Sequence, residues 1–72
     1  MSVTIYVGLV GEGINVWRPV LAEQERDDVF RILGTQPTGE TWQFTPGDLV
    51  RCRQHVFAGG EAGLVAYEKA AA

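Results

Sequence analysis

Apolar and polar residues alternate along the first part of the chain. Four apolar residues stand at every second position: Val3, Ile5, Val7 and Leu9. Successive side chains of a β-strand point to opposite faces, so this alternation predicts a first strand with one apolar face. The stretch "GEG" follows, and we expect Gly11 and Gly13 to form a turn there, because glycine readily adopts turn conformations.

A second strand is predicted from about Asn15, with Val16, Val20 and Ala22 on the face that turns to the core. Pro19 lies within this strand and has no backbone N–H to donate to a neighbour. The strand should therefore be an edge, or should bend, at this proline. The stretch "EQERDD", residues 23–28, is polar throughout and predicts the solvated connection of a hairpin.

Two further short strands are predicted in the middle of the chain. "VFRIL", residues 29–33, places Phe30 and Ile32 on one face, with Val29, Arg31 and Leu33 on the other. "GTQPTGE" ends it, and "TWQF", residues 41–44, alternates two aromatic residues as a fourth strand. "TPGD" then predicts a type II turn, with Pro46 and Gly47 at its two central positions.

The last third of the chain predicts two more strands. "LVRCRQHVF", residues 49–57, places Val50 and Cys52 opposite Arg51 and Arg53. "LVAYEK", residues 64–69, is the other, although the same region is rich in helix-forming residues. We favour a strand there over a helix after Gly60, because Gly63 would cost about 1 kcal/mol inside a helix.

Five or six short strands, with turn signals between them and no amphipathic helix, predict an all-β fold. At 72 residues the chain has room for one domain, residues 1–72, with its core over approximately residues 3–69. The expected architecture is a small SH3-like barrel or a similarly rolled antiparallel sheet. Closing the sheet would also remove exposed edges that recruit other chains.

Four stretches of the sequence together resemble a known group of proteins: "EGINVWRPV", "FRILG", "WQFTPGDLVRC" and "GLVAYEK". They are similar to small bacterial proteins of uncharacterised function with the pattern EGxxVWRPV, WxFxPGDxVxC and LVAxE. The resemblance covers about residues 12–69 and implies a compact SH3-like β fold, but no activity or functional residue. The chain departs from the pattern at Leu21, where a polar residue is expected, and in its alanine tail.

Composition and charge limit the functions that the chain can have. Six basic residues stand against nine acidic ones, a net charge of −3, which argues against binding nucleic acid through its phosphates. The single cysteine excludes an internal disulfide, and no Cys/His spacing suits zinc. No apolar run approaches the roughly 20 residues of a membrane helix, and no basic region precedes the first apolar run. We therefore expect a cytoplasmic protein without cofactor, metal or membrane contact.

Candidate catalytic groups are few. Cys52 and His55 are the one thiol–imidazole pair, but their odd spacing on a strand points them to opposite faces, with Cys52 buried. The acidic residues of "EQERDD" lie in a polar turn, where nothing would desolvate their carboxyl groups and shift their pKa values. "GLVGEG" lacks the glycine order and the following helix of a phosphate-binding loop. These patterns favour a protein that is not an enzyme.

Aromatic and basic residues form the remaining candidate site. If Val16, Val20 and Ala22 face the core, the opposite face carries an outer strip, consisting of Trp17, Pro19 and Leu21. Such a strip indicates a surface for a protein or peptide partner, including a second copy of the chain. Alternatively, Trp17 and Trp42 cap the two ends of the core, with Trp42 the better core candidate.

The basic residues leave other functions open. Arg18 falls on the core-facing side of its strand and must reach the barrel rim or pair with an acid. Arg51 and Arg53 would flank the outer strip only if the fold brings their strand beside it. The sequence thus favours a non-catalytic protein- or peptide-binding module. A nucleic-acid-binding barrel that uses the three arginines and Trp17 is the alternative, and a cysteine-dependent enzyme built on Cys52 and His55 is the third hypothesis.

Overall fold

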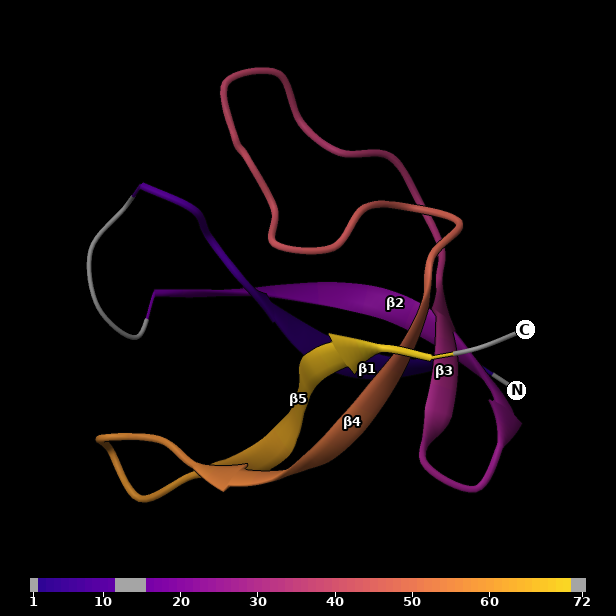
Figure 1. Cartoon of the computed structure of the whole chain (residues 1–72). Helices are drawn as coiled ribbons and strands as arrows, with labels where there is room; N and C mark the ends of the chain where they lie inside the picture. Colours follow the sequence, from indigo (N-terminus) through magenta and orange to yellow (C-terminus); the bar gives the residue numbers. More distant parts are fainter. Residues whose placement is uncertain (1, 12–15, 71–72) are drawn as a thin grey trace.

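The computed structural model describes residues 2–11 and 16–70, and it is an all-β structure whose five strands form a closed barrel (Figure 1). The strands are β1 (Ser2–Gly8), β2 (Trp17–Arg26), β3 (Val29–Ile32), β4 (Leu49–Val56) and β5 (Ala62–Lys69). They are neighbours in chain order and pair antiparallel, and the parallel pairing of β1 with β5, at Tyr6 and Val65, closes the barrel. The predicted all-β class and small SH3-like barrel architecture are confirmed. No helix in the described residues could cross a membrane.

Most of the interior of the barrel is filled by residues that the alternation assigns to the apolar faces. The interior cluster consists of Ile5, Val7, Val20, Ala22, Phe30, Ile32, Trp42, Phe44, Val50, Cys52 and Ala66. Every strand contributes to it, and each buried residue is at most 7% exposed. Burial of this apolar surface is the main stabilising term, because the described residues contain no disulfide and no cluster of side chains that could hold a metal ion.

The polar stretch after the second strand differs from its prediction. We expected residues 23–28 to connect two strands, but β2 continues to Arg26 and pairs with β3 up to that residue. The turn itself is short and includes Asp27, whose φ of 36° is in the left-handed region that aspartate tolerates better than most residues. The polar side chains of this hairpin are mostly exposed while their backbone is paired, so polarity alone did not mark a loop.

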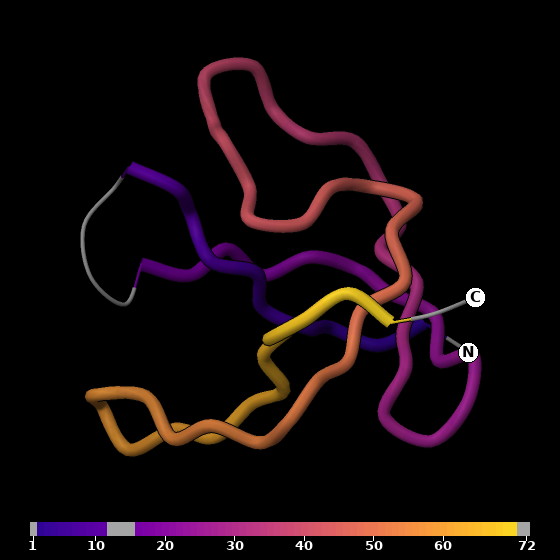
Figure 2. The backbone as a smooth tube through the Cα atoms, viewed as in Figure 1, coloured from indigo at the N-terminus to yellow at the C-terminus, as the bar shows by residue number. Residues whose placement is uncertain are grey.

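The segment between β3 and β4 contains the other error (Figure 2). The predicted strand at residues 41–44 is reduced to one isolated bridge between Trp42 and Leu9. Two backbone hydrogen bonds tie this bridge to the end of β1: the Val10 N–H donates to Thr41 O, and the Gln43 N–H donates to Gly8 O. Trp42 still turns inward, as the alternation predicts, at 6% exposure.

The predicted turn before β4 and the predicted strand at the C-terminus are both confirmed. Gly47 has a φ of 93°, and the Asp48 N–H donates to Thr45 O at 3.0 Å, which closes the "TPGD" turn. Residues 62–69 form β5 rather than a helix. The positions predicted for a turn at Gly13 and a strand start at Asn15 lie outside the described residues.

Pro19 lies where β2 has a neighbour on only one side. It is opposite Tyr6 of β1, whereas the pairing of β2 with β3 begins only at Ala22. On the side of β3, the strand is therefore an edge at Pro19, as the missing N–H requires. The proline is compatible with the barrel because the pairing of β2 with β3, which would need its N–H, does not extend to this residue.

Candidate functional site

Four aromatic side chains gather on the outside of the barrel, apart from the interior cluster. They are Tyr6 of β1, Trp17 of β2, His55 of β4 and Phe57, which follows β4; we call them the outer aromatic cluster. The Phe57 ring lies 4.9 Å from Tyr6, 5.1 Å from His55 and 6.1 Å from Trp17, measured between ring centroids. All three pairs are edge-to-face, an arrangement that the ring quadrupoles favour. Phe57 is therefore the centre of the cluster.

One glycine of β5 makes room for two of these rings. A Cβ atom at Gly63 of β5 would lie 2.8 Å from Cε1 of Tyr6 and 3.1 Å from Cε2 of Phe57, so both rings pack directly over the glycine backbone. Gly8 of β1 is the cross-strand partner of Trp17, but a Cβ there would lie 3.9 Å from the indole, which is an ordinary contact distance, so the ring does not require this glycine. The outer face of the barrel thus lacks a side chain at Gly63, where two aromatic rings cross it.

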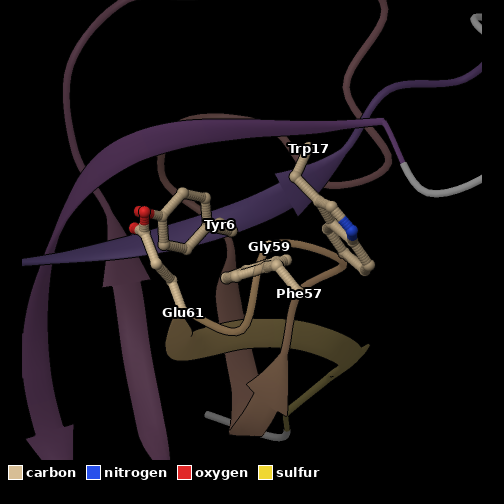
Figure 3. A pocket seen from close by; sticks show the side chains of 5 residues that line it. All are labelled: Tyr6, Trp17, Phe57, Gly59 and Glu61. Atoms are coloured by element: carbon tan, nitrogen blue, oxygen red, sulfur yellow. The ribbon is translucent and has the colours of Figure 1, made fainter.

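A pocket opens between three of the rings and the hairpin that joins β4 to β5. Its lining consists of Tyr6, Trp17, Phe57, Gly59 and Glu61, and its volume is about 240 Å³. In Figure 3, Tyr6 and Glu61 line one side of the pocket and Trp17 lines the other, with Phe57 between them. We call it the aromatic pocket.

The hairpin that carries Glu61 is held by its own backbone. The Phe57 N–H donates to Glu61 O, and the Gly60 N–H donates to Phe57 O, both at 2.8 Å. Gly60 has a φ of 89°, which glycine adopts without strain. The backbone of Glu61 is therefore fixed relative to Phe57, while its side chain is exposed to solvent.

The outer cluster also covers apolar surface beneath it. Val65 of β5 is 3% exposed, although it is not part of the interior cluster. It lines a second hollow together with Trp17, His55, Arg53 and Tyr67. The guanidinium carbon of Arg53 lies 4.9 Å from the centroid of the Tyr67 ring, a cation–π contact. The outer rings are thus anchored by packing and do not project freely into solvent.

The structure divides the outer strip that the sequence suggests. Trp17, Pro19 and Leu21 do share the outer face of β2, and Leu21 is 56% exposed. Trp17 is only half-buried and belongs to the outer aromatic cluster. Pro19 and Leu21 instead line a separate hollow beside the segment after β3, together with Leu33 and Pro37. The strip is therefore divided between the depressions beside Trp17 and the separate hollow beside Pro19 and Leu21.

Arg18 pairs with an acid, which is one of the two outcomes predicted for an arginine on the core-facing side. Its Nε donates to Oε1 of Glu40 at 3.1 Å, and its Nη2 pairs with Oε2 of the same carboxylate. The Trp42 indole N–H also donates to Oε1 of Glu40, at 2.9 Å. The hydrogen bonds from Trp42 and Arg18 lower the pKa of the Glu40 carboxyl group. Arg18 thus fixes the rim of the barrel, and Trp42, not Trp17, is the core tryptophan.

The other two arginines of the candidate site differ in their surroundings. β4 is not a neighbour of β2 in the barrel, so the sheet does not bring Arg51 beside the strip. Arg51 instead pairs with Asp28 at 3.0 Å and lies 3.9 Å from a carboxylate oxygen of Glu68. Arg53 is closer to the outer cluster, because it shares the second hollow with Trp17.

Cys52 and His55 lie on opposite faces of β4. Cys52 is 4% exposed in the interior, whereas the His55 ring lies 5.6 Å from Trp17 on the outside. Desolvation, with a contribution from the charge of Asp28, raises the pKa of the Cys52 thiol to about 11. The thiol is therefore protonated at neutral pH, which is the unreactive form.

Sequence reasoning did not assign Tyr6, His55, Phe57 or Glu61 to the site. His55, Phe57 and Glu61 lie at the end of β4 and in the hairpin after it, and they meet Tyr6 of β1 only because β5 closes the barrel against β1. Two signals were present in the sequence: an aromatic residue at an outward position of the first strand, and glycines inside two strands. Glycine within a strand often marks a close approach of another group.

Comparison of the chain with models of protein families, with curated protein sequences and with solved structures finds no match. What the site can bind therefore follows from its own side chains.

Proposed function

We propose that this domain is a non-catalytic module that binds a peptide segment of a partner protein through the outer aromatic cluster and the adjoining outer strip. The observation that carries the proposal is the presence of two separate apolar groups. One fills the barrel, and the other, built on Tyr6, Trp17 and Phe57, borders a pocket on the outside. Aromatic side chains gathered on a protein surface are typical of binding sites.

The packing of the rings favours binding. Phe57 holds Tyr6 and Trp17 through edge-to-face contacts, and Gly63 gives the Tyr6 and Phe57 rings space against the sheet. Side chains that are already ordered lose less conformational entropy when a ligand binds. The pocket is also small: pockets for drug-sized ligands hold roughly 300–1,000 Å³, whereas this one has about 240 Å³. Its size suits one side chain of a peptide.

The electrostatics support a peptide in preference to nucleic acid. Arg18 and Arg51 are both engaged with carboxylates, so their charges are already compensated. The net charge of the chain is −3. This acidic protein has little uncompensated positive charge that could attract the phosphate backbone of a nucleic acid.

The same proposal includes the setting in which the module works. Cys52 is a free thiol, which suits a reducing compartment such as the cytoplasm. We also propose a bacterial origin, which rests on the resemblance of four stretches of the chain to small bacterial proteins. The partner proposed for this surface is another protein or a second copy of the chain.

An amide chemical-shift titration tests the proposal. The ¹⁵N-labelled domain is titrated with short basic, acidic and proline-rich peptides, and with single-stranded oligonucleotides. We expect a peptide to shift the resonances of Tyr6, Trp17 and Phe57, and Trp17→Ala to weaken that peptide while the domain stays folded. Val10→Ala is the matched control, because Val10 is also an exposed apolar residue, at 53% exposure, and lines none of these hollows. Oligonucleotide binding with steep salt dependence, in the absence of peptide binding, would contradict the proposal.

A further inference from the structure

We infer that the aromatic pocket receives a positively charged side chain, a lysine or an arginine, from the partner peptide. This inference rests on the proposed function and specifies the chemistry that the pocket selects. It is built on two features that occur together: three aromatic rings and one carboxylate that line the same small space.

The rings offer faces to a cation. Phe57 is inclined by 62° to Tyr6 and by 68° to Trp17, so the three rings do not stack against one another. Each edge-to-face contact covers a face of only one of its two rings, and the face of an aromatic ring carries the negative part of its quadrupole. A cation within about 6 Å of such a face is attracted to it, most strongly by tryptophan. In Figure 3, Tyr6 and Trp17 flank the pocket from two sides, so a guest between them is close to both.

The charge of the pocket has one sign. Glu61 is the one charged residue of its lining, and the described part of the chain gives it no ion pair. Arg53 lies close to the cluster, but it lines the neighbouring hollow and its guanidinium group lies over the Tyr67 ring. No lysine or arginine is among the residues that line the aromatic pocket. A basic side chain would therefore bring a compensating charge, whereas an acidic one would be repelled.

Shape and position support the same guest. A lysine or arginine side chain has a long apolar stem that can lie along aromatic surface while its charged end reaches a carboxylate. Glu61 lies on the hairpin, and its backbone is hydrogen-bonded to Phe57, so the side chain that carries the carboxylate starts from a fixed point at the wall of the pocket. The apolar stem of the guest can thus pack against the aromatic rings while its charged end approaches the Glu61 carboxylate.

The test uses one peptide in four versions. A five-residue peptide of glycine and serine carries lysine, trimethyl-lysine, arginine or norleucine at its centre, and its ends are blocked. Norleucine has the apolar stem of lysine without the charge. Binding is measured by the shifts of the Trp17 indole and Gly59 amide resonances in the full-length domain. We expect the three cationic peptides to bind at least about five-fold more tightly than the norleucine peptide, with an affinity that falls as salt is added.

Two variants that each remove one negative charge distinguish the effect of the Glu61 carboxylate from the effect of the net charge of the domain. Glu61→Gln keeps the shape of the side chain and its backbone hydrogen bond, and it should weaken the cationic peptides by about three-fold or more. Glu23→Gln changes an exposed carboxylate of β2 that does not line the pocket, and it should leave the affinity unchanged. Both positions are exposed, so neither variant threatens the fold.

The outcomes distinguish this inference from the function on which it rests. If the norleucine peptide binds at the outer cluster as tightly as the lysine peptide, the pocket selects apolar groups and the inference is wrong, while the peptide-binding function stands. The inference is also wrong if Glu61→Gln and Glu23→Gln weaken binding equally. If none of the four peptides, and none of the wider panel of peptides, shifts the cluster, the proposed function fails as well.

Discussion

Replacement of Gly63 by alanine tests whether the outer aromatic cluster is packed against the sheet as described. The added Cβ would lie 2.8 Å from Cε1 of Tyr6 and 3.1 Å from Cε2 of Phe57, whereas ordinary contacts begin at 3.4 Å. To restore ordinary contacts, the Tyr6 ring must therefore move by about 0.6 Å and the Phe57 ring by about 0.3 Å.

Two opposing terms determine the change in the free energy of unfolding. Alanine is better than glycine inside a strand by about 0.5–1 kcal/mol. Overpacking of a filled site costs about 1–3 kcal/mol. The packing term is the larger, so we expect Gly63→Ala to destabilise the domain by roughly 0.5–2 kcal/mol, with a melting temperature lower by several degrees. The displaced rings should also weaken the peptide that binds at the cluster.

Urea unfolding, followed by circular dichroism, measures this change. Gly59→Ala is the control, because a Cβ there has no neighbour within 4 Å, and Gly59 does not have a positive φ. This control should be neutral or slightly stabilising. If Gly63→Ala stabilises the domain as an ordinary glycine-to-alanine change in a strand would, the rings do not pack over β5 and the description of the cluster is wrong.

The remaining predictions concern the rim, the interior thiol and the two tryptophans. The pKa of Glu40 is lowered in the fold, so its contribution to stability is present above its ordinary value of 4.5 and is lost as the pH falls below it. The difference in unfolding free energy between the wild type and Glu40→Gln should therefore shrink between pH 5 and pH 2 (about the range of carboxyl titration); a constant difference would refute this role. The pKa of Cys52 is raised from 9.0 to about 11, so the fold should lose up to about 3 kcal/mol as the pH rises from 9 to 11, and Cys52→Ala should lack this component. A thiol reagent at pH 8 should modify Cys52 only at the rate of unfolding, and immediate modification would show that the thiol is accessible. Trp42→Ala removes an interior side chain and should cost about 3–5 kcal/mol, which Trp17→Ala should not approach; equal losses in thermal unfolding would place Trp17 in the core.

Much of the barrel follows from local sequence patterns. Alternation identified the interior positions of the strands, including Ile5, Val50 and Cys52, because the two-residue period of a strand is a local property. The same rule assigned Arg18 to the core-facing side, where it had to reach the barrel rim or pair with an acid, but it did not identify Glu40, which is 22 residues away.

The errors arose where tertiary pairing outweighs local character. "EQERDD" is polar enough for a loop, but its backbone is paired with β3 while its side chains face solvent. "TWQF" has the alternation of a strand, but only one residue of it, Trp42, finds a bridge partner, at the end of β1. The residues of a segment do not determine whether it pairs as a strand, because pairing also depends on which backbone lies beside it.

The candidate site was predicted in part for the same reason. Trp17 could be placed on the outer face from the alternation of its own strand. Its neighbours Tyr6, His55 and Phe57 could not be found in this way, because they meet across β1, β4 and β5 only after the barrel closes. Glu61 lies in a turn whose sequence alone gives no reason to place it beside aromatic rings.

The central claim, that the outer aromatic cluster is the surface that binds, is tested most directly by the two tryptophan indole resonances. Trp17 lies in the outer cluster, while the indole N–H of Trp42 donates to Glu40 beside the interior. The two signals report on the outside and the inside of the same barrel in one ¹H–¹⁵N spectrum. When the lysine-containing peptide is added, we predict that the indole signal of Trp17 shifts in a saturable manner and that of Trp42 stays in place. A spectrum in which Trp42 shifts and Trp17 does not would contradict the account.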